Sequence, residues 1–326
     1  MSAAKNLTNP GLWLTLVVVL LLGVWPILTD SDSSREETFN VLRAVILASS
    51  LNILLGYTGY VSFGHIVFFG LGGYVGMYLI IEQGWLLWPA MAAGGLAAGA
   101  LALALGRAIL RLRGAYFALA TIGVNEAMRA FVNQFEPFGG TTGLSLNFRV
   151  YREDYGDVAN ALLLAYYAAL GLALASILLS YLVKTSKFGL GLQAIREDED
   201  AAEVMGVVTP RSKTWAYVLS ALLPGAMGTV FFFKSLNIEP SQAFRLHSSI
   251  EYLVMVMLGG YGTVFGPMLG AVGYQRLRGY LLTSTLFKNI QLSVAGALLL
   301  VIILFIPAGA VGWLRHRFPA ARRFLP

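Results

Sequence analysis

The most strongly charged part of the chain is the stretch SKFGLGLQAIREDEDAAEVMGV, residues 186–207, centred on the run Arg196-Glu197-Asp198-Glu199-Asp200. No Ser-His-Asp or paired-carboxylate arrangement stands out around it or elsewhere. His65, His247 and His316 are far apart and lack a metal-ligand spacing such as HExxH, cysteine is absent, and there is no phosphate-binding loop of the form GxxxxGK[ST]. We therefore expect no enzyme, no metal site and no cofactor bound by this chain.

Polar side chains also interrupt the apolar sequence NILLGYTGYVSFGH, residues 52–65, which we call the first glycine segment. Polar residues inside a membrane span are costly and suggest function, and glycines permit an unwound backbone where it lines a cavity. The second glycine segment, LGGYGTVFGP at residues 258–267, has Gly-Tyr and Phe-Gly in the same order, which indicates an internal repeat. Both segments are interpreted as lining a transport path, with packing turns as the alternative. The candidate path residues in them are Asn52, Tyr57, Thr58, Ser62, His65 and Tyr261.

Three further path candidates, Asn125, Glu126 and Arg129, lie in the apolar run 115–133. Glu126 and Arg129 are three residues apart, so on a helix they face the same side and neutralise each other. One interpretation is a structural ion pair. The other is contact with a zwitterionic solute, whose ammonium and carboxylate groups would match the two charges.

The composition places these residues in a membrane protein. Of 326 residues, 57% are hydrophobic and only 12% are charged, whereas a soluble domain carries about a quarter charged residues. Several uncharged runs reach the roughly 18 apolar residues that indicate a membrane span, which excludes a soluble enzyme. Because backbone groups in hydrocarbon must be satisfied internally, we predict an all-α fold that forms a single polytopic domain over residues 1–326.

The apolar runs between polar breaks predict about ten spans. The eighth is too short to cross about 30 Å at 1.5 Å per residue, so it is half of a broken helix or the start of a longer bent one. The first is interpreted as a retained helix, with a removable signal peptide as the alternative. Small residues at Gly72-x-x-x-Gly76 and Gly95-x-x-x-Gly99 predict close helix packing. The predicted runs are 11–29, 40–57, 61–81, 86–107, 115–133, 158–183, 213–234, 248–259, 263–281 and 289–306.

Basic residues predict the orientation of these spans. With the N-terminus inside and ten crossings, three clusters share the cytoplasmic side, as the positive-inside rule requires, and both termini lie in the cytoplasm. Arg276, Arg278 and Lys288 fall on the other side and count mildly against this arrangement. The net charge of +6 then reflects anchoring to anionic lipid. Nucleic-acid binding is not expected, since no basic stripe is interleaved with stacking aromatics.

The same topology places residues 184–212, which we call the charged segment, in the cytoplasm between the sixth and seventh spans. We predict two short helices in it: the first over Leu190–Arg196, the second capped by Asp200, with Glu203 three residues on and Gly206 at the C′ position. A solvated loop is the alternative. A rigid element with an apolar tip suits docking to a soluble partner, and an ATPase would supply the energy that this chain cannot. The predicted docking residues are Leu192, Ile195, Arg196, Glu197, Asp198, Glu199, Ala202 and Met205.

The stretch FGLGLQAIREDEDAAEVMGV resembles the cytoplasmic signature of membrane subunits of branched-chain amino acid ABC importers, the LivM type. Three other stretches support the resemblance over most of residues 51–285, and they are LNILLGYTGYVSFGHIVFFGLGGY (51–74), RGAYFALATIGVNEAMRAFVNQFEPFGGTTGL (113–144) and SSIEYLVMVMLGGYGTVFGPMLGA (248–271). The resemblance implies a ten-helix type II importer permease in a bacterial or archaeal inner membrane. It also implies a sister permease subunit, two ATPases that use ATP and Mg, and a soluble substrate-binding protein.

The resemblance leaves the transported solute open. Branched-chain amino acids are favoured, while relatives of this type are thought to carry urea, short amides or aromatic acids. An ion-coupled secondary carrier is a rival reading, with Glu126 as its one candidate carboxylate. A membrane transferase would need a clustered acid–base or metal site, and a scaffold without transport function would not need glycine-broken polar segments.

Overall fold

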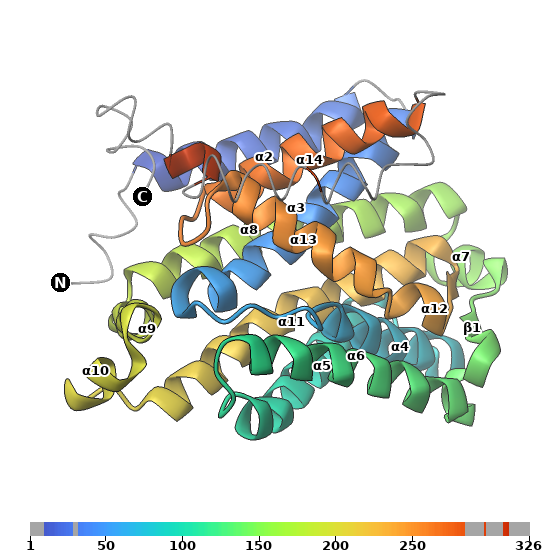
Figure 1. Cartoon of the computed structure of the whole chain (residues 1–326). Coiled ribbons are helices and arrows are strands. Elements are labelled where there is room, and N and C mark those ends of the chain that lie inside the picture. The colour runs from blue at the N-terminus through green and yellow to red at the C-terminus, as the bar shows by residue number, and fades with distance from the viewer. Residues whose placement is uncertain (1–9, 29–31, 284–296, 298–308, 313–326) are drawn as a thin grey trace.

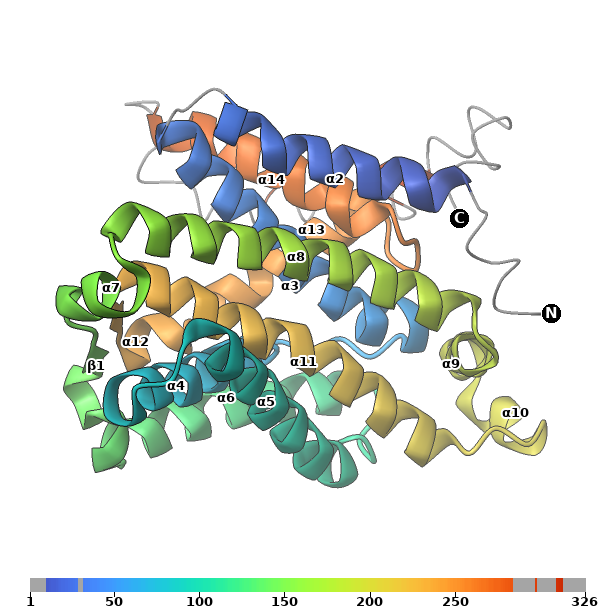
Figure 2. The same cartoon turned by 180° about the vertical axis from the view of Figure 1, so that it is seen from behind.

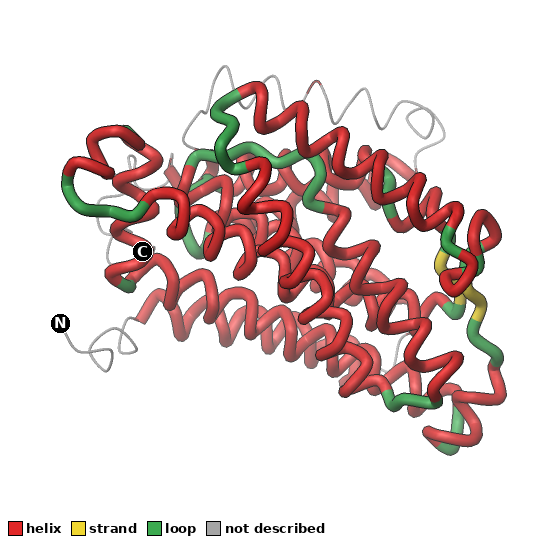
Figure 3. The backbone as a smooth tube through the Cα atoms, turned by 90° about the horizontal axis from the view of Figure 1, so that it is seen from below, coloured by secondary structure: helices red, strands yellow, loops and turns green. Residues whose placement is uncertain are grey.

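The structure is a computed structural model in which residues 10–28, 32–283, 297 and 309–312 are described (Figure 1). The chain is helical almost throughout this part, and its only strand pairing joins two strands of two residues each (Figure 3). The predicted all-α fold is therefore confirmed. The predicted tenth span, 289–306, lies outside the described residues apart from a single position.

Nine helices of the described part follow the first nine predicted runs, and five of them are long and apolar enough to cross a membrane. Those five are Ser33–Thr58 (within α3), α4, α5, α8 and α11. The nine are α2 (Pro10–Leu28), α3 (Asp32–Thr58), α4 (Ile66–Gln83), α5 (Leu87–Ile109), α6 (Ala115–Gln134), α8 (Val158–Thr185), α11 (Thr209–Ser235), α13 (Leu246–Gly259) and α14 (Gly266–Thr283).

The two largest differences between predicted and observed helix starts are those of α3 and α4. α3 begins at Asp32 instead of residue 40, because its charged first turns have partners on other helices: Glu36 pairs with Lys234, and Glu37 with Arg276 at 3.4 Å. α4 begins at Ile66 instead of residue 61. Residues 59–65 of the first glycine segment are not helical, as the interpretation of an unwound backbone requires.

The eighth and ninth runs form two separate helices, α13 and α14, which pack against each other in a hairpin. The turn between them is the second glycine segment. α13 has 14 residues, or about 21 Å at 1.5 Å per residue, so the expectation of a run too short to span is confirmed. Gly259 and Gly270 allow the two backbones to touch, since a Cβ on Gly270 would lie 1.8 Å from the Met255 carbonyl oxygen.

The centre of the molecule is α11, which packs against α5, α4, α3 and α8. Glycine faces bring these helices together, as predicted. A Cβ on Gly72 of α4 would lie 2.2 Å from the carbonyl oxygen of Gly225 on α11, and one on Gly76 would lie 2.2 Å from the Thr229 hydroxyl. The contact at Gly72 is backbone against backbone, so α4 and α11 cannot accept a larger side chain there without moving apart.

We expect Gly72→Ala to destabilise the fold by about 1–3 kcal/mol, the usual cost of overpacking a core. The measurement is thermal unfolding in detergent. Gly171→Ala on α8 is the matched control, because nothing lies within 4 Å of a Cβ at that position and alanine is the better helix former. Equal stability of the two variants would contradict the close packing of α4 on α11.

The two ends of the helix bundle differ in character. One end carries α9 (Lys187–Glu197) and α10 (Glu199–Val204) (Figure 1). The opposite end carries β1 paired antiparallel with β2, Leu144 opposite Ile238. The short elements of that end are η1 (Glu136–Phe138), η2 (Gly140–Thr142), β1 (Leu144–Ser145), α7 (Phe148–Tyr155), β2 (Asn237–Ile238) and α12 (Pro240–Ala243).

Candidate functional site: the charged segment and the glycine segments

The charged segment folds into the two predicted short helices, α9 and α10. The N-cap of α10 is Asp198, whose Oδ1 accepts hydrogen bonds from the backbone N–H groups of Asp200 at 2.9 Å and Ala201 at 3.0 Å. The prediction of Asp200 as the cap was wrong by two residues, because Asp200 already lies in the first turn. Gly206 has φ of 89°, the left-handed conformation expected of the C′ residue.

The apolar residues of the charged segment divide between an inner and an outer face. Leu192, Ile195 and Ala202 are buried in one cluster with Ile53 and Tyr57 of α3. They were predicted as docking residues, and burial corrects this: they hold the charged segment on the bundle and present no surface to a partner. Hydrophobic burial explains the difference, because the sequence shows which residues are apolar and not which side the bundle covers.

Arg196 joins α9 to both glycine segments. Its Nη1 donates a hydrogen bond to the Gly56 carbonyl oxygen at 2.8 Å, and its guanidinium lies 4.5 Å from the centre of the Tyr261 ring. Asn52 ties the same two segments together: its Nδ2 donates to the Thr263 carbonyl at 2.9 Å, and its Oδ1 accepts from the Gly262 N–H at 2.9 Å. Two stretches whose contacting residues are 210 and 211 positions apart thus form one unit, which Arg196 holds together.

Glycine is required at the centre of this unit. A Cβ on Gly56 would lie 2.5 Å from the Gly262 nitrogen and 2.1 Å from Asn52 Oδ1. The observed backbone approach would then be impossible. Gly262 itself has φ of 74°, a conformation that favours glycine. The internal similarity noticed in the sequence therefore corresponds to a contact between the two segments.

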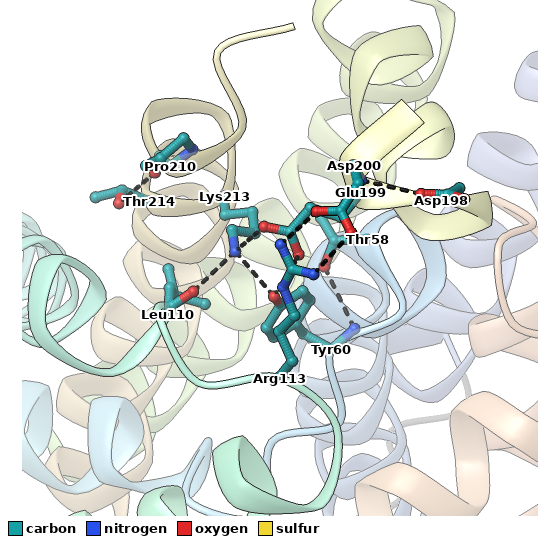
Figure 4. A network of polar contacts seen from close by, with 10 residues as sticks. All are labelled: Thr58, Tyr60, Leu110, Arg113, Asp198, Glu199, Asp200, Pro210, Lys213 and Thr214. Carbon is teal, nitrogen blue, oxygen red and sulfur yellow. Dashed lines mark hydrogen bonds and ion pairs between the residues drawn. The ribbon is translucent and has the colours of Figure 1, made fainter. Parts of the chain in front are cut away.

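A second contact joins α10 to α11 and to the first glycine segment through Glu199 (Figure 4). Glu199 Oε1 lies 2.6 Å from Lys213 Nζ, and Glu199 Oε2 accepts a hydrogen bond from the Tyr60 hydroxyl at 2.9 Å. Lys213 Nζ also donates to the Tyr60 hydroxyl and to the Leu110 carbonyl oxygen, both at 2.8 Å. Glu199, the Tyr60 hydroxyl and the Leu110 carbonyl thus accept all three protons of the Lys213 ammonium group. The side chains of Lys213 and Glu199 are only 4% and 13% exposed.

Arg113 closes this network from the turn between α5 and α6. Its Nη2 lies 2.8 Å from Asp200 Oδ1, and its Nε lies 3.4 Å from Glu199 Oε2. The hydrogen bond and charge of Arg113 lower the pKa of the Asp200 carboxyl. Tyr60, Arg113 and Lys213 were not predicted as site residues. For Lys213 the sequence offered one signal: a lysine at the first position of the predicted span 213–234, following the acidic part of the charged segment.

The outer face of the charged segment is apolar at its tip and acidic beside it. Val204 is 87% exposed and Met205 84% exposed, and Leu190 and Val208 are each 63% exposed. Glu197, Asp198 and Glu203 are exposed around them. Of the predicted docking residues, Met205, Glu197 and Asp198 therefore lie on the surface, while Arg196 and Glu199 face inward.

The path candidates of the first glycine segment separate into packing residues and residues with free polar atoms. The hydroxyl of Tyr57 lies 2.7 Å from Ser180 Oγ and joins α3 to α8. Thr58 Oγ1 donates to the Leu54 carbonyl at 2.6 Å and closes the end of α3. These contacts favour the packing interpretation for Tyr57 and Thr58.

Ser62, His65 and Asn125 are buried polar residues with unused hydrogen-bonding capacity. Within the described residues, Ser62 Oγ, both ring nitrogens of His65 and Asn125 Oδ1 make no hydrogen bond of ordinary geometry. Asn125 Nδ2 donates to the Phe244 carbonyl at 2.9 Å, and Phe63 N–H donates to Thr121 Oγ1 at 3.1 Å, so α6 and the unwound stretch are adjacent. Buried polar atoms without partners are rare. The Tyr217 hydroxyl lies beside Ser62 and the Ser220 backbone lies beside His65, so these two residues also fit the packing interpretation.

Glu126 and Arg129 form the predicted ion pair, with Arg129 Nη2 2.6 Å from Glu126 Oε2. The pair lies near the middle of the 20-residue helix α6, and both side chains are almost half exposed. The same face of α6 exposes Tyr116 and Leu119. This face of α6 is therefore left uncovered by the rest of the described chain.

No group of three or more potential metal ligands occurs in the part of the chain that the structure describes. Five helices that are long and apolar enough to cross a membrane indicate a multi-pass membrane protein. The chain belongs to the family described as "branched-chain amino acid transport system / permease component", whose model matches residues 39–306.

Individual relatives agree with this family. The chain is 30% identical over 282 residues to the "high-affinity branched-chain amino acid transport system permease protein LivM" of Escherichia coli, and 29% identical to that of Salmonella typhimurium. The alignments cover 79% of this chain and 66% of each LivM protein. The LivH permease protein of Escherichia coli is 24% identical over 82% of this chain and 90% of LivH. No solved structure matches the chain.

Proposed function

We propose that the chain is a permease subunit of an ATP-binding-cassette importer for branched-chain or related amino acids. The named function of the LivM and LivH relatives supports the transport class. The observation that carries the coupling mechanism is the position of the charged segment. Arg196 binds it to α3 and the α13–α14 turn. Glu199 binds it to Lys213 of α11, and Lys213 in turn donates to the Leu110 carbonyl oxygen at the end of α5.

A force on the charged segment would therefore act on two parts of the bundle at once. The exposed tip at Val204 and Met205 would contact a soluble ATPase, and ATP-driven movement of that partner would tilt the two parts relative to each other. ATP and Mg would be used by two such ATPases and not by this chain, which would not be an enzyme itself. This assignment places the charged segment in the cytoplasm of a bacterial or archaeal cell, with both termini on the same side.

We expect the double variant Val204→Asp/Met205→Asp to abolish copurification of the ATPase subunits and to reduce uptake to background. Both side chains are more than 80% exposed, so the fold should tolerate the change, and two carboxylates in an apolar contact are costly to desolvate. Phe148→Asp, at an exposed site on the opposite end of the bundle, is the control and should keep the ATPases bound. Normal ATPase binding by the double variant would refute docking at this tip.

We further propose that the exposed face of α6 lies against the sister permease subunit and lines the path between them. A charged residue facing lipid at the bilayer centre costs at least about 2.5–3.5 kcal/mol. The pair Glu126 and Arg129 would avoid this cost only if protein or water covers it. A zwitterionic amino acid, delivered by a substrate-binding protein at the end that carries α7 and β1, would find both complementary charges there.

Exchanging the two charges separates this role from a structural ion pair. Glu126→Arg/Arg129→Glu keeps the pair and its spacing, so a purely structural pair would leave uptake unchanged. We expect uptake to fall at least about tenfold, since a misplaced charge pair costs a hydrogen bond to a charged group, about 1.5–3 kcal/mol. Transport of a radiolabelled amino acid into proteoliposomes of the assembled complex is the measurement. The amount of assembled complex serves as the control for folding.

A further inference from the structure

A groove lined by cationic side chains opens between the end of α5 and the start of α11. It has a volume of about 720 Å³, and its charged lining is Arg107, Arg111, Arg113, Arg211 and Lys213, with Glu199 and Glu203 as the carboxylates. Figure 2 shows α5 and α11 on the near face, with the groove end of α11 leading to α10. Figure 1 shows α6 on the opposite side, so this groove does not share the face that carries Glu126 and Arg129.

Three of these arginines have no carboxylate partner among the described residues. Lys213 and Arg113 are bound to Glu199 and Asp200. Arg107, Arg111 and Arg211 are exposed, and none of them makes an ion pair within the described chain. Like charges crowded at one site repel each other, so the groove is suited to an anion, and the planar guanidinium group is suited to the two oxygens of a phosphate.

An exposed apolar stripe along α5 leads to this groove. Residues four apart are neighbours on the surface of a helix, and here every member of a series at this spacing, which winds slowly around α5, is exposed and apolar. Leu96 in its middle is 68% exposed. Trp215 of α11, 46% exposed, lines the groove itself, and tryptophan is typical of the membrane interface. The stripe is Trp88, Ala92, Leu96, Ala100 and Ala104, and it ends at Arg107.

We infer that this groove binds the phosphate of an anionic phospholipid, with the acyl chains lying along the α5 stripe. Charge alone would suit free phosphate or an acidic protein equally well. The stripe decides for lipid, because only a lipid joins a phosphate to apolar chains. Such a chain spans one leaflet, about 15 Å, and would cover the part of the 23-residue helix α5 next to the groove. The inference depends on the membrane location of α5 and not on the transported solute or the ATPase partner.

Native mass spectrometry of the full-length protein in detergent, titrated with dioleoyl phosphatidylglycerol, tests the inference. The wild type should retain phosphatidylglycerol in preference to phosphatidylcholine. Arg107→Gln/Arg111→Gln/Arg211→Gln should weaken phosphatidylglycerol binding on the order of a hundredfold, since each arginine near an anionic surface contributes about a factor of five. The control Arg149→Gln/Arg152→Gln/Arg245→Gln removes the same charge from exposed sites at the other end and should bind as the wild type does.

Three outcomes would overturn the inference. Unchanged phosphatidylglycerol binding by the groove variant means that the arginines do not hold the lipid, and an equal loss in the control means that net charge alone decides. Displacement of the lipid by glycerol 3-phosphate at a similar concentration means that the stripe adds nothing and that the groove takes free phosphate. Circular dichroism of both variants confirms that they are folded.

Discussion

Glu199→Leu is expected to destabilise the protein by roughly 3–5 kcal/mol, the cost of breaking a buried ion pair and leaving one charge without its partner. Lys213 is 4% exposed, so its ammonium would remain inside the protein with only the Tyr60 hydroxyl and the Leu110 carbonyl as acceptors. Such a loss is a large part of the 5–15 kcal/mol that a typical domain has in total.

The double variant Glu199→Leu/Lys213→Met should recover most of that stability, because replacing both members of a buried pair with apolar groups is often neutral or stabilising. Transport should not recover with it, since the double variant no longer fixes α10 to α11. Unfolding in detergent, followed by circular dichroism, measures the first effect, and uptake in proteoliposomes measures the second. Glu203→Leu, at an exposed position of the same helix, is the control. Equal effects of Glu199→Leu and Glu203→Leu would rule out the buried network.

Arg196→Gln is expected to uncouple ATP hydrolysis from uptake in the assembled transporter. The variant loses the charged hydrogen bond to the Gly56 carbonyl and the contact with the Tyr261 ring, while the exposed tip that would contact the ATPase is unchanged. We expect uptake to fall about tenfold or more, because a hydrogen bond to a charged group contributes about 1.5–3 kcal/mol. The ATPase activity of the complex should persist.

Two neighbouring variants make this expectation specific. Tyr261→Phe keeps the ring under the guanidinium and should transport normally, whereas Tyr261→Ala should share part of the Arg196→Gln defect. Arg196→Lys should be intermediate, because an ammonium group cannot both stack on the ring and donate in the same geometry. A proportional fall of hydrolysis and uptake in Arg196→Gln would instead assign Arg196 to the ATPase contact surface.

A combined charge reversal of Arg196, Glu197 and Glu199 is a natural first experiment from the sequence, which predicts uncoupling with intact membrane insertion. The structure divides the three residues between two roles. Glu197 is exposed and belongs to the outer face, while Arg196 and Glu199 hold the charged segment on the bundle. The single variants described above therefore separate effects that the triple variant would merge.

Much of the fold is predictable from the sequence because hydrophobic runs report helices directly. The runs 86–107, 115–133 and 158–183 match α5, α6 and α8 to within two residues at either end. The two glycine segments and the ion pair of Glu126 and Arg129 are also predictable, since glycine spacing and a three-residue interval on a helix have a fixed geometric meaning.

Which face of the charged segment packs against the bundle is not predictable in this way. Leu192 and Met205 are both apolar residues of one short segment, yet the first is buried and the second is exposed. The sequence also cannot place Tyr60 beside Lys213, because they come from different loops and helices. Such contacts depend on how the helices pack together and not on the secondary-structure propensity of either segment.

The contact that Arg196 makes ends on the main-chain carbonyl oxygen of Gly56, whereas Glu199 meets the side chains of Lys213 and Tyr60. A carbonyl acceptor is present whatever side chain the residue carries. Position 56 is also restricted to glycine by the approach of the Gly262 nitrogen, so no matched change is expected between it and Arg196. Comparisons that search for residues changing together across homologous chains would therefore find a signal between Glu199 and Lys213 but none between Arg196 and position 56.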